Sequence, residues 1–267
     1  MKHKINLAPL KLVTSSTKDL VNGILQNAST RKGRMYTYAN ADTVLRASTS
    51  PRFRAAIENA TFCYADGWGA VLHSRLVFGN QITKSSTDDF FANLISQGVN
   101  RDLRIALVGS QSDTTVRARK HLAAQVNGSN PLATAMRYRE QIYCRSGYFN
   151  SEEDEHSYLD ILERFNPELV VVGMGQPIQE IWADRTRRRF PNTTFLCVGG
   201  LFDLVAKNIP TPPSWIRRSG LEWCFRLATK PQHTWRRYLL GLPALAAISC
   251  AQVCNTQLLN AEQGIKG

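Results

Sequence analysis

The first residue in this sequence with an evident chemical use is a carboxylate placed directly after a short apolar run. Asp66 follows residues 61–64, which read as a short strand, and it precedes Gly67. A carboxylate held at the end of a strand can act as a general base toward a substrate hydroxyl. The competing interpretation, which position alone slightly favours, is that Asp66 caps a following helix through a backbone N–H.

Four other polar residues occupy similar positions, at predicted strand ends or in first helical turns. They are Asn40, Asp89, Gln179 and Asp203. Each of them could equally be a helix cap, because polar side chains at these positions accept hydrogen bonds from backbone N–H groups. Only the convergence of these side chains at one place would therefore indicate a site.

Three glycine-containing turns follow the apolar runs that read as strands. Glycine lets the backbone approach a ligand closely, and a helix that begins behind such a turn favours phosphate. None of the turns is a complete G-x-G-x-x-G or Walker loop, which argues against dinucleotide or P-loop chemistry. Each turn alone is more often only a tight turn, and the candidate ligand-binding glycines are Gly109, Gly173, Gly175, Gly199 and Gly200.

The elements that must position these residues read as repeated strand–helix units. The clearest strands are short apolar runs that end in glycine and lead into helices, at residues 103–108, 169–172 and 194–198. Weaker strands are predicted at 34–38 and 61–64, with a helix that begins at residue 41. Such units form open, mostly parallel sheets with helices on both faces. We therefore predict a Rossmann-like α/β core over residues 1–204, with ligands bound at the carboxyl ends of its strands.

The chain changes character at residues 209–213, a cluster with three prolines that neither a helix nor a central strand tolerates. Residues 205–267 hold eight basic and two acidic residues, which is half of the net charge of +12, and they include Trp215, Trp223 and Trp235. Basic residues interleaved with Trp fit nucleic acid, nucleotide phosphate or an anionic membrane, and a solvated charged face is the plainer alternative. We predict a basic, Trp-rich helical appendage over residues 205–267.

An apolar stretch at residues 238–253 lies within this appendage and contains Pro243. It is too short and too kinked to span a bilayer, which takes about 20 apolar residues. Docking on the core and lying in a membrane interface both remain open for it.

The overall composition excludes several classes of protein. The chain has 267 residues, of which 43% are hydrophobic, so it is neither disordered, collagenous nor a disulfide scaffold. The basic N-terminus lacks a signal-peptide core, so we expect a chain that is not exported. The six cysteines show no C-x-x-C pair and no zinc-like spacing with the five histidines, so we expect reduced, mostly buried thiols and no metal.

Several motifs, in order along the chain, carry a resemblance to a known family. They lie at residues 173–180, 198–203, 215–226 and 231–238, and two earlier segments, 39–40 and 65–69, agree with them. With this order and spacing over about residues 35–243, the sequence resembles the WecG/TagA/CpsF family of bacterial glycosyltransferases.

The resemblance implies a GT-E-type enzyme that acts in bacterial exopolysaccharide or cell-surface glycan synthesis. It would move a hexose or acetamido-hexose from a UDP-sugar to a polyprenyl-diphosphate-linked acceptor, with inversion and without a metal or other cofactor. N-acetylmannosamine, its uronic acid and glucose are all donor sugars that the family allows. The enzyme would be cytoplasmic, peripheral on the inner face of the membrane and in contact with anionic lipid, as a monomer or a homo-oligomer.

The resemblance also assigns roles to individual residues of the predicted core. Asp66 matches the catalytic base, which would deprotonate the acceptor hydroxyl, and Asn40 and Gln179 match residues beside the donor sugar. Phe202 and Asp203 fall in the nucleotide-binding wall, next to the glycine turns.

In the appendage, Arg218, Arg226 and Arg237 match arginines that close over the pocket and meet the diphosphate. Guanidinium groups suit phosphate oxygens, and a cation must offset the charge of departing UDP if no metal does so. Two departures from the family pattern flank the donor-sugar pocket: Tyr38 replaces the usual Thr, and residues 84–89, which end in Asp89, lack the family's glycine.

Two alternatives from other functional classes compete with the enzyme hypothesis. The basic, Trp-rich tail could serve a nucleic-acid-binding module, although the sequence has no helix-turn-helix, RRM or zinc signature. A catalytically inactive membrane-tethering homologue is the other, and the presence of Asp66, Gln179 and the arginines argues against it.

Overall fold

The computed structural model describes residues 16–67, 69–71, 75, 82–126, 130–211, 213, 216, 222–229, 243, 246–247 and 250, and the backbone of two short strands near the N-terminus. These two strands, β1 (Lys4–Leu7) and β2 (Leu10–Val13), form an antiparallel hairpin, a separate two-stranded sheet whose second strand lies against one edge strand of the main sheet. The hairpin was not predicted from the sequence.

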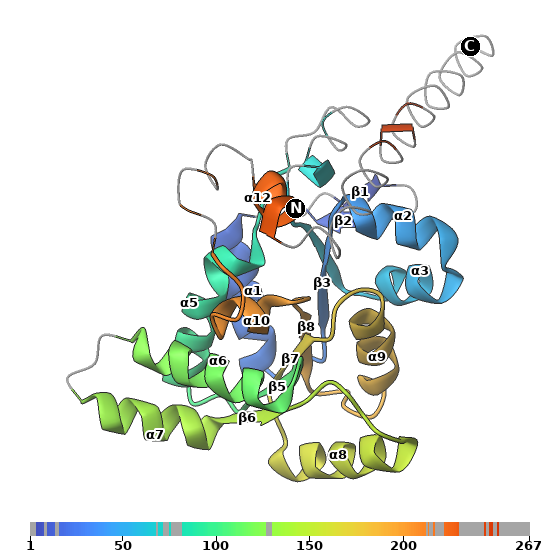
Figure 1. The fold of residues 1–267 in the computed structure, drawn as a ribbon. Helices are drawn as coiled ribbons and strands as arrows, with labels where there is room; N and C mark the ends of the chain where they lie inside the picture. The colour runs from blue at the N-terminus through green and yellow to red at the C-terminus, as the bar shows by residue number, and fades with distance from the viewer. Residues whose placement is uncertain are drawn as a thin grey trace.

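The main sheet has six parallel strands in the order β4-β3-β8-β7-β5-β6 (Figure 1). Because all the strands are parallel, their carboxyl ends meet at one edge of the sheet. The predicted open, parallel α/β core is confirmed. The strands are β3 (Met35–Ala39), β4 (Phe62–Ala65), β5 (Ile105–Gly109), β6 (Ile142–Arg145), β7 (Leu169–Gly173) and β8 (Thr194–Cys197).

Helices cover both faces of this sheet (Figure 1). One face carries α1 (Thr17–Ser29), α5 (Thr87–Asn100), α6 (Ser112–Ala124), α7 (Pro131–Gln141) and the short α10 (Leu201–Val205). The other face carries α2 (Ala41–Thr49), α3 (Pro51–Glu58), α8 (Glu152–Phe165) and α9 (Ile178–Thr186). A further helix, α12 (Glu222–Thr229), lies in the predicted appendage.

The core consists of two apolar layers, one on each face, and the central strands contribute to both. In β7, Leu169 and Val171 pack toward the α1 and α5 side, whereas Val170 and Val172 pack toward α8 and α9. This alternation follows from the two-residue period of a strand. Each such side chain contributes about 1.5–3 kcal/mol when it is fully buried. The double coverage explains why β7 reads in the sequence as an uninterrupted apolar run.

The connections of the sheet place its crevice between β5 and β7. The chain leaves β5 toward β6 at one edge of the sheet, and it leaves β7 toward β8 in the opposite direction. In open parallel sheets, ligands bind at the carboxyl ends of the strands where the order reverses in this way. The turns that follow β5, β7 and β8 are the predicted glycine turns, so the topology gathers them at one edge.

Most of the predicted appendage lies outside the described residues, including nearly all of the apolar stretch 238–253. Within the described part of the chain, no helix is both long enough and apolar enough to cross a bilayer. The prediction of mostly buried thiols is wrong for the described cysteines. Only Cys63 and Cys197 are buried, whereas Cys144 and Cys224 are partly exposed and Cys250 is exposed.

Candidate active site

Asp66 and Asn40 leave neighbouring strands side by side at the carboxyl edge of the sheet. The backbone N–H of Asp66 donates to the carbonyl oxygen of Ala39, at 2.9 Å, and Asn40 is the next residue after Ala39. Asp66 is half-buried, and the Gly67 that follows it has a φ of +104°. Tyr64 lies in the core beneath Asp66. Its pKa is raised mainly by its own burial and then by the negative charge of the Asp66 carboxylate. The predicted base therefore lies at the rim, close to the predicted sugar-binding Asn40.

Asn40 is a helix cap, as the alternative interpretation of the sequence allowed. Its Oδ1 accepts the backbone N–H of Thr43 at 3.1 Å, and its own backbone N–H donates to Thr43 Oγ1 at 3.0 Å. This reciprocal pair is a capping box, which satisfies two of the N–H groups at the start of α2. The cap uses the oxygen of the Asn40 side chain, so the amide nitrogen is the group that remains for a ligand.

Gln179 is buried, and hydrogen bonds hold both ends of its amide within the protein. Its Nε2 donates to Glu180 Oε1 at 2.7 Å, and its Oε1 accepts the backbone N–H of Gly199 at 2.8 Å. Gln179 thus ties the first turn of α9 to the turn that follows β8. Gln179, which was predicted to lie beside the sugar, therefore contacts the rim through the backbone N–H of Gly199.

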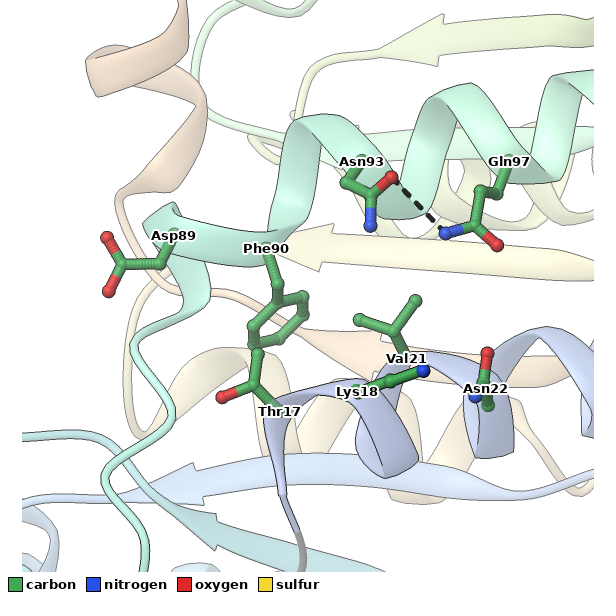
Figure 2. Close-up of a pocket in the computed structure, with 8 residues that line it drawn as sticks. All are labelled: Thr17, Lys18, Val21, Asn22, Asp89, Phe90, Asn93 and Gln97. Atoms are coloured by element: carbon green, nitrogen blue, oxygen red, sulfur yellow. Dashed lines mark hydrogen bonds between the residues drawn. The ribbon is translucent and has the colours of Figure 1, made fainter.

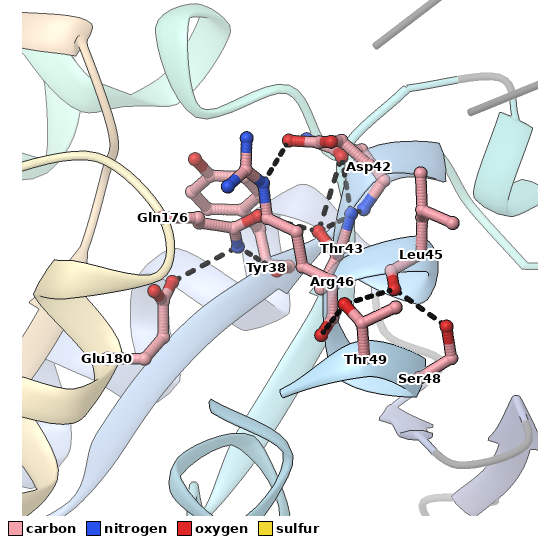
Figure 3. Close-up of polar contacts among 10 residues, drawn as sticks. Tyr38, Asp42, Thr43, Leu45, Arg46, Ser48, Thr49, Gln176 and Glu180 are labelled. Carbon is pink, nitrogen blue, oxygen red and sulfur yellow. Dashed lines mark hydrogen bonds and ion pairs between the residues drawn. The ribbon is translucent and has the colours of Figure 1, made fainter. Parts of the chain in front are cut away.

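A second glutamine, Gln176, joins the loop after β7 to the end of β3 and the first turn of α2 (Figure 3). Its Nε2 donates to the carbonyl oxygen of Tyr38 at 3.0 Å and to Glu180 Oε1 at 3.1 Å. Its Oε1 accepts the hydroxyl of Thr43 at 2.7 Å, and Thr43 is the capping partner of Asn40. Gln176 therefore connects the Asn40 cap with the start of α9.

The carboxyl ends of β5 and β7 approach each other closely because both strands end in glycine. The φ of Gly109 is +149°, and a Cβ at this position would lie 2.3 Å from the carbonyl oxygen of Gly173. The backbone N–H of Ser110 donates to that same oxygen at 3.1 Å. The Ser110 hydroxyl donates to Asp203 Oδ2 at 3.1 Å, so Asp203 is held against the end of β5.

The turn after β8 completes the rim. Gly199 has a φ of +64°, and a Cβ there would lie 2.5 Å from the hydroxyl oxygen of Tyr38. Gly175 and Gly200 instead border open space, since a Cβ at either position would have no heavy atom of a described residue within 4 Å. Phe202 is fully buried, with its ring packed over Gly173, so it supports the predicted nucleotide wall from behind.

Asp89 is the predicted site residue that lies on α5. It is exposed in the first turn of α5 and lines a groove of about 490 Å³ between α1 and α5 (Figure 2). Its carboxylate points away from the amides of Asn93 and Gln97, which line the same groove. Asn40, Asp66 and Gln179 are not among the residues that line this groove.

The predicted diphosphate clamp falls outside the part of the chain that the structure describes. Arg218 and Arg237 lie outside the described residues, as does the side chain of Arg226 on α12. In the described part of the chain, no group of three His, Cys, Asp or Glu side chains could hold a metal ion.

Sequence reasoning missed the polar residues behind the rim, which are the buried Thr37, Thr43 and Glu180 and the partly exposed Gln176. The spacing of the buried residues along α9 could have indicated one of them, Glu180. Glu180 is three residues before Ala183 and six before Thr186, all on the buried side of α9. A carboxylate within an otherwise buried stripe indicates a specific partner.

Comparison with known proteins identifies the family. The sequence model of the glycosyl transferase WecG/TagA/CpsF family matches residues 5–258. A Bacillus spizizenii (strain W23) protein named N-acetylglucosaminyldiphosphoundecaprenol N-acetyl-beta-D-mannosaminyltransferase is 29% identical over 216 residues, which cover 79% of this chain and 77% of the relative. A Bacillus subtilis (strain 168) protein of the same name is 27% identical over 214 residues, covering 80% and 78%. Because the family match spans nearly the whole chain, this protein belongs to the WecG/TagA/CpsF family and is a glycosyltransferase.

Proposed function

We propose that this chain transfers an N-acetylmannosaminyl group from its UDP-sugar to a lipid-diphosphate-linked N-acetylglucosamine. The observation that carries this proposal is the activity for which the two Bacillus relatives are named, each aligned over more than three quarters of both chains. Among the donors that the family resemblance allows, the relatives' names favour N-acetylmannosamine and give no support to UDP-glucose.

In the proposed reaction, Asp66 is the general base. Its carboxylate takes the proton of the acceptor hydroxyl, and the acceptor oxygen forms a bond to C1 of the donor sugar. The bond between C1 and the β-phosphate oxygen breaks, and UDP departs with that electron pair. Attack opposite to the leaving group inverts the configuration at C1. The half-buried position of Asp66 at the carboxyl edge of the sheet supports this role.

The donor would lie along the rim formed by the ends of β3, β5, β7 and β8. Asn40 would face the sugar with its amide nitrogen, and Asp89 would border the sugar from α5. The open space beside Gly175 and Gly200, together with Asp203 on the Ser110 hydroxyl, supports a nucleotide path along the turns. Gln179 would act on this path through the Gly199 backbone.

Arg218, Arg226 and Arg237 would offset the charge that develops on the departing diphosphate. Charge-assisted hydrogen bonds in a closed site are strong, and no metal ion is needed if guanidinium groups supply the cation. We also propose that the 205–267 appendage closes on the 1–204 core. Its basic residues and tryptophans would hold the enzyme as a peripheral protein on the cytoplasmic face of the membrane, where anionic lipids attract such segments.

A donor screen tests the proposed function. The full chain is offered UDP-N-acetylmannosamine, its uronic acid form or UDP-glucose, with lipid-diphosphate-linked N-acetylglucosamine, and the products are identified by mass. We expect one N-acetylmannosamine to be added, in the presence of EDTA as well. Calorimetry with UDP should show binding that also survives EDTA. A chain that neither binds UDP nor extends the acceptor with any donor would refute the proposal.

Replacing Asp66 by Asn separates the base from the binding site. The variant should lose about 10²–10⁴-fold in turnover, which is the usual contribution of a general base, while UDP binding is retained. Asp102→Asn is the matched control, because Asp102 is an exposed carboxylate before β5, at the opposite edge of the sheet. Near-normal turnover of the Asp66→Asn variant would show that another group takes the proton.

A further inference from the structure

A buried carboxylate behind the rim has no part in the reaction described above. Glu180 lies in the first turn of α9 and is completely inaccessible to solvent. Burial raises the pKa of this carboxyl group, and the hydrogen bonds that oppose the shift come from uncharged partners. A buried carboxylate without a cationic partner is costly for stability, so its presence calls for a specific reason.

One oxygen of Glu180 gathers three hydrogen bonds from different parts of the fold. Oε1 accepts the Thr37 hydroxyl of β3 at 2.9 Å, the Gln176 amide at 3.1 Å and the Gln179 amide at 2.7 Å. The other oxygen, Oε2, is buried and has no hydrogen-bond partner among the described residues. The thiols of Cys63 and Cys197 are close enough to interact with the carboxyl group and are themselves buried.

These contacts decide which way the two glutamine amides point. Glu180 Oε1 can only accept, so Gln179 must turn its Nε2 toward Glu180 and present its Oε1 to the Gly199 N–H. Gln176 likewise turns its Nε2 inward, and its Oε1 accepts the Thr43 hydroxyl that belongs to the Asn40 capping box (Figure 3). A single acceptor atom thereby fixes the loops after β3, β7 and β8.

We propose that Glu180 is a positioning residue for sugar transfer: its Oε1 fixes the Gln176 and Gln179 amides and so holds the Asn40 loop and the Gly199–Gly200 turn in the donor-binding arrangement. The proposal rests on the proposed function for its kinetic consequences, but not for its structural ones. What the site needs from Glu180 is an acceptor oxygen of carbonyl type, because all three contacts at Oε1 are donated to it.

The test compares Glu180→Gln with Glu180→Ala. Gln keeps a carbonyl oxygen at Oε1 and places its amide nitrogen where Oε2 lies, so transfer should stay within about threefold of the wild type. Ala leaves three buried donors without their acceptor, and kcat/KM for the donor should fall about 10- to 100-fold, while KM for the acceptor stays unchanged. Glu168→Ala is the matched control, because Glu168 is a largely buried carboxylate that pairs with Arg31 and Arg104 on the amino side of the sheet. It should lower stability without changing the donor KM.

Hydrogen exchange of the segment around Gly199 gives a readout that needs no activity. Exchange should be faster in Glu180→Ala and in Gln179→Ala, and unchanged in Glu180→Gln and Glu168→Ala. Gln179→Ala removes the amide that links Glu180 to the Gly199 N–H. It therefore tests the same connection if Glu180→Ala does not fold.

The outcomes separate the two proposals. Normal donor kinetics and normal Gly199 protection in Glu180→Ala would overturn the positioning role. Equal losses in Glu180→Gln and Glu180→Ala would overturn it too, since charge rather than an acceptor oxygen would then matter. If the wild type neither bound UDP nor transferred sugar, the proposed function would fail, and the exchange comparison would still decide the role of Glu180.

Discussion

The close approach of the ends of β5 and β7 predicts that Gly109→Ala lowers the free energy of unfolding much more than Gly200→Ala does. In Gly109→Ala, the new Cβ would lie 2.3 Å from the Gly173 carbonyl oxygen, a backbone atom that cannot swing aside as a flexible side chain could. The φ of +149° adds strain of about 1–3 kcal/mol for a residue with a side chain. Separating the strands also weakens the hydrogen bond from Ser110 N–H to Gly173, which adds about 0.5–1.5 kcal/mol.

Together these effects should lower the free energy of unfolding by about 2–4 kcal/mol, measured by urea denaturation. The melting temperature should fall by about 5–15 °C, since a chain of this size loses about 2–4 °C per kcal/mol. Gly200→Ala is the matched control, because its φ is −78° and, in the part of the chain that the structure describes, no heavy atom lies within 4 Å of the Cβ position. Its stability should stay within about 0.5 kcal/mol of the wild type. Equal stability of the Gly109→Ala and Gly200→Ala proteins would refute the reasoning.

Three further predictions concern the appendage and the buried carboxylate. Arg218→Ala should lower turnover by about 10²–10³-fold with UDP and donor still bound, in steady-state kinetics, and an unchanged kcat would remove Arg218 from the clamp. Truncation after Lys207 should abolish both transfer and sedimentation with anionic liposomes; if both persist, the tail has only a structural role. Because burial raises the pKa of Glu180 above its ordinary 4.5, the stability linked to its neutral form is fully present below pH 4.5 and is lost as the pH rises through the folded-state pKa. The free energy of unfolding of the wild type should therefore fall relative to Glu180→Gln as the pH rises above 4.5, and a constant difference between their urea curves at all pH values would contradict this.

Five of the six strands and their order of appearance could be predicted because the signal is local, whereas β6 (Ile142–Arg145) was not predicted. Burial on both faces turns β5, β7 and β8 into continuous apolar runs, and each leads into a glycine that the next turn needs. The cap at Asn40 was also within reach, because its partner Thr43 is only three residues away. The hairpin at residues 4–13 stands apart from this pattern and was missed.

The polar contacts behind the rim could not be predicted, because they join residues far apart in the sequence. Thr37 and Glu180 are separated by 143 positions, and Gln179 reaches Gly199 across 20. The position of Gln179 in the sequence left a helix cap and a ligand contact equally open, and only the fold reveals that both ends of its amide are bonded within the protein. The role of Gln179 beside the sugar stays a prediction, and the structure adds that its amide is bonded to the turn after β8.

The contact between Tyr38 and Gly199 constrains how the carboxyl edge of the sheet could be redesigned. The Tyr38 hydroxyl occupies the space that a side chain at position 199 would need, so the two positions form a coupled pair. A larger residue at position 199 requires a shorter one at position 38, in addition to a backbone that accepts its positive φ. Grafting a turn that carries a side chain at position 199 must therefore exchange the end of β3 and the turn after β8 as one unit.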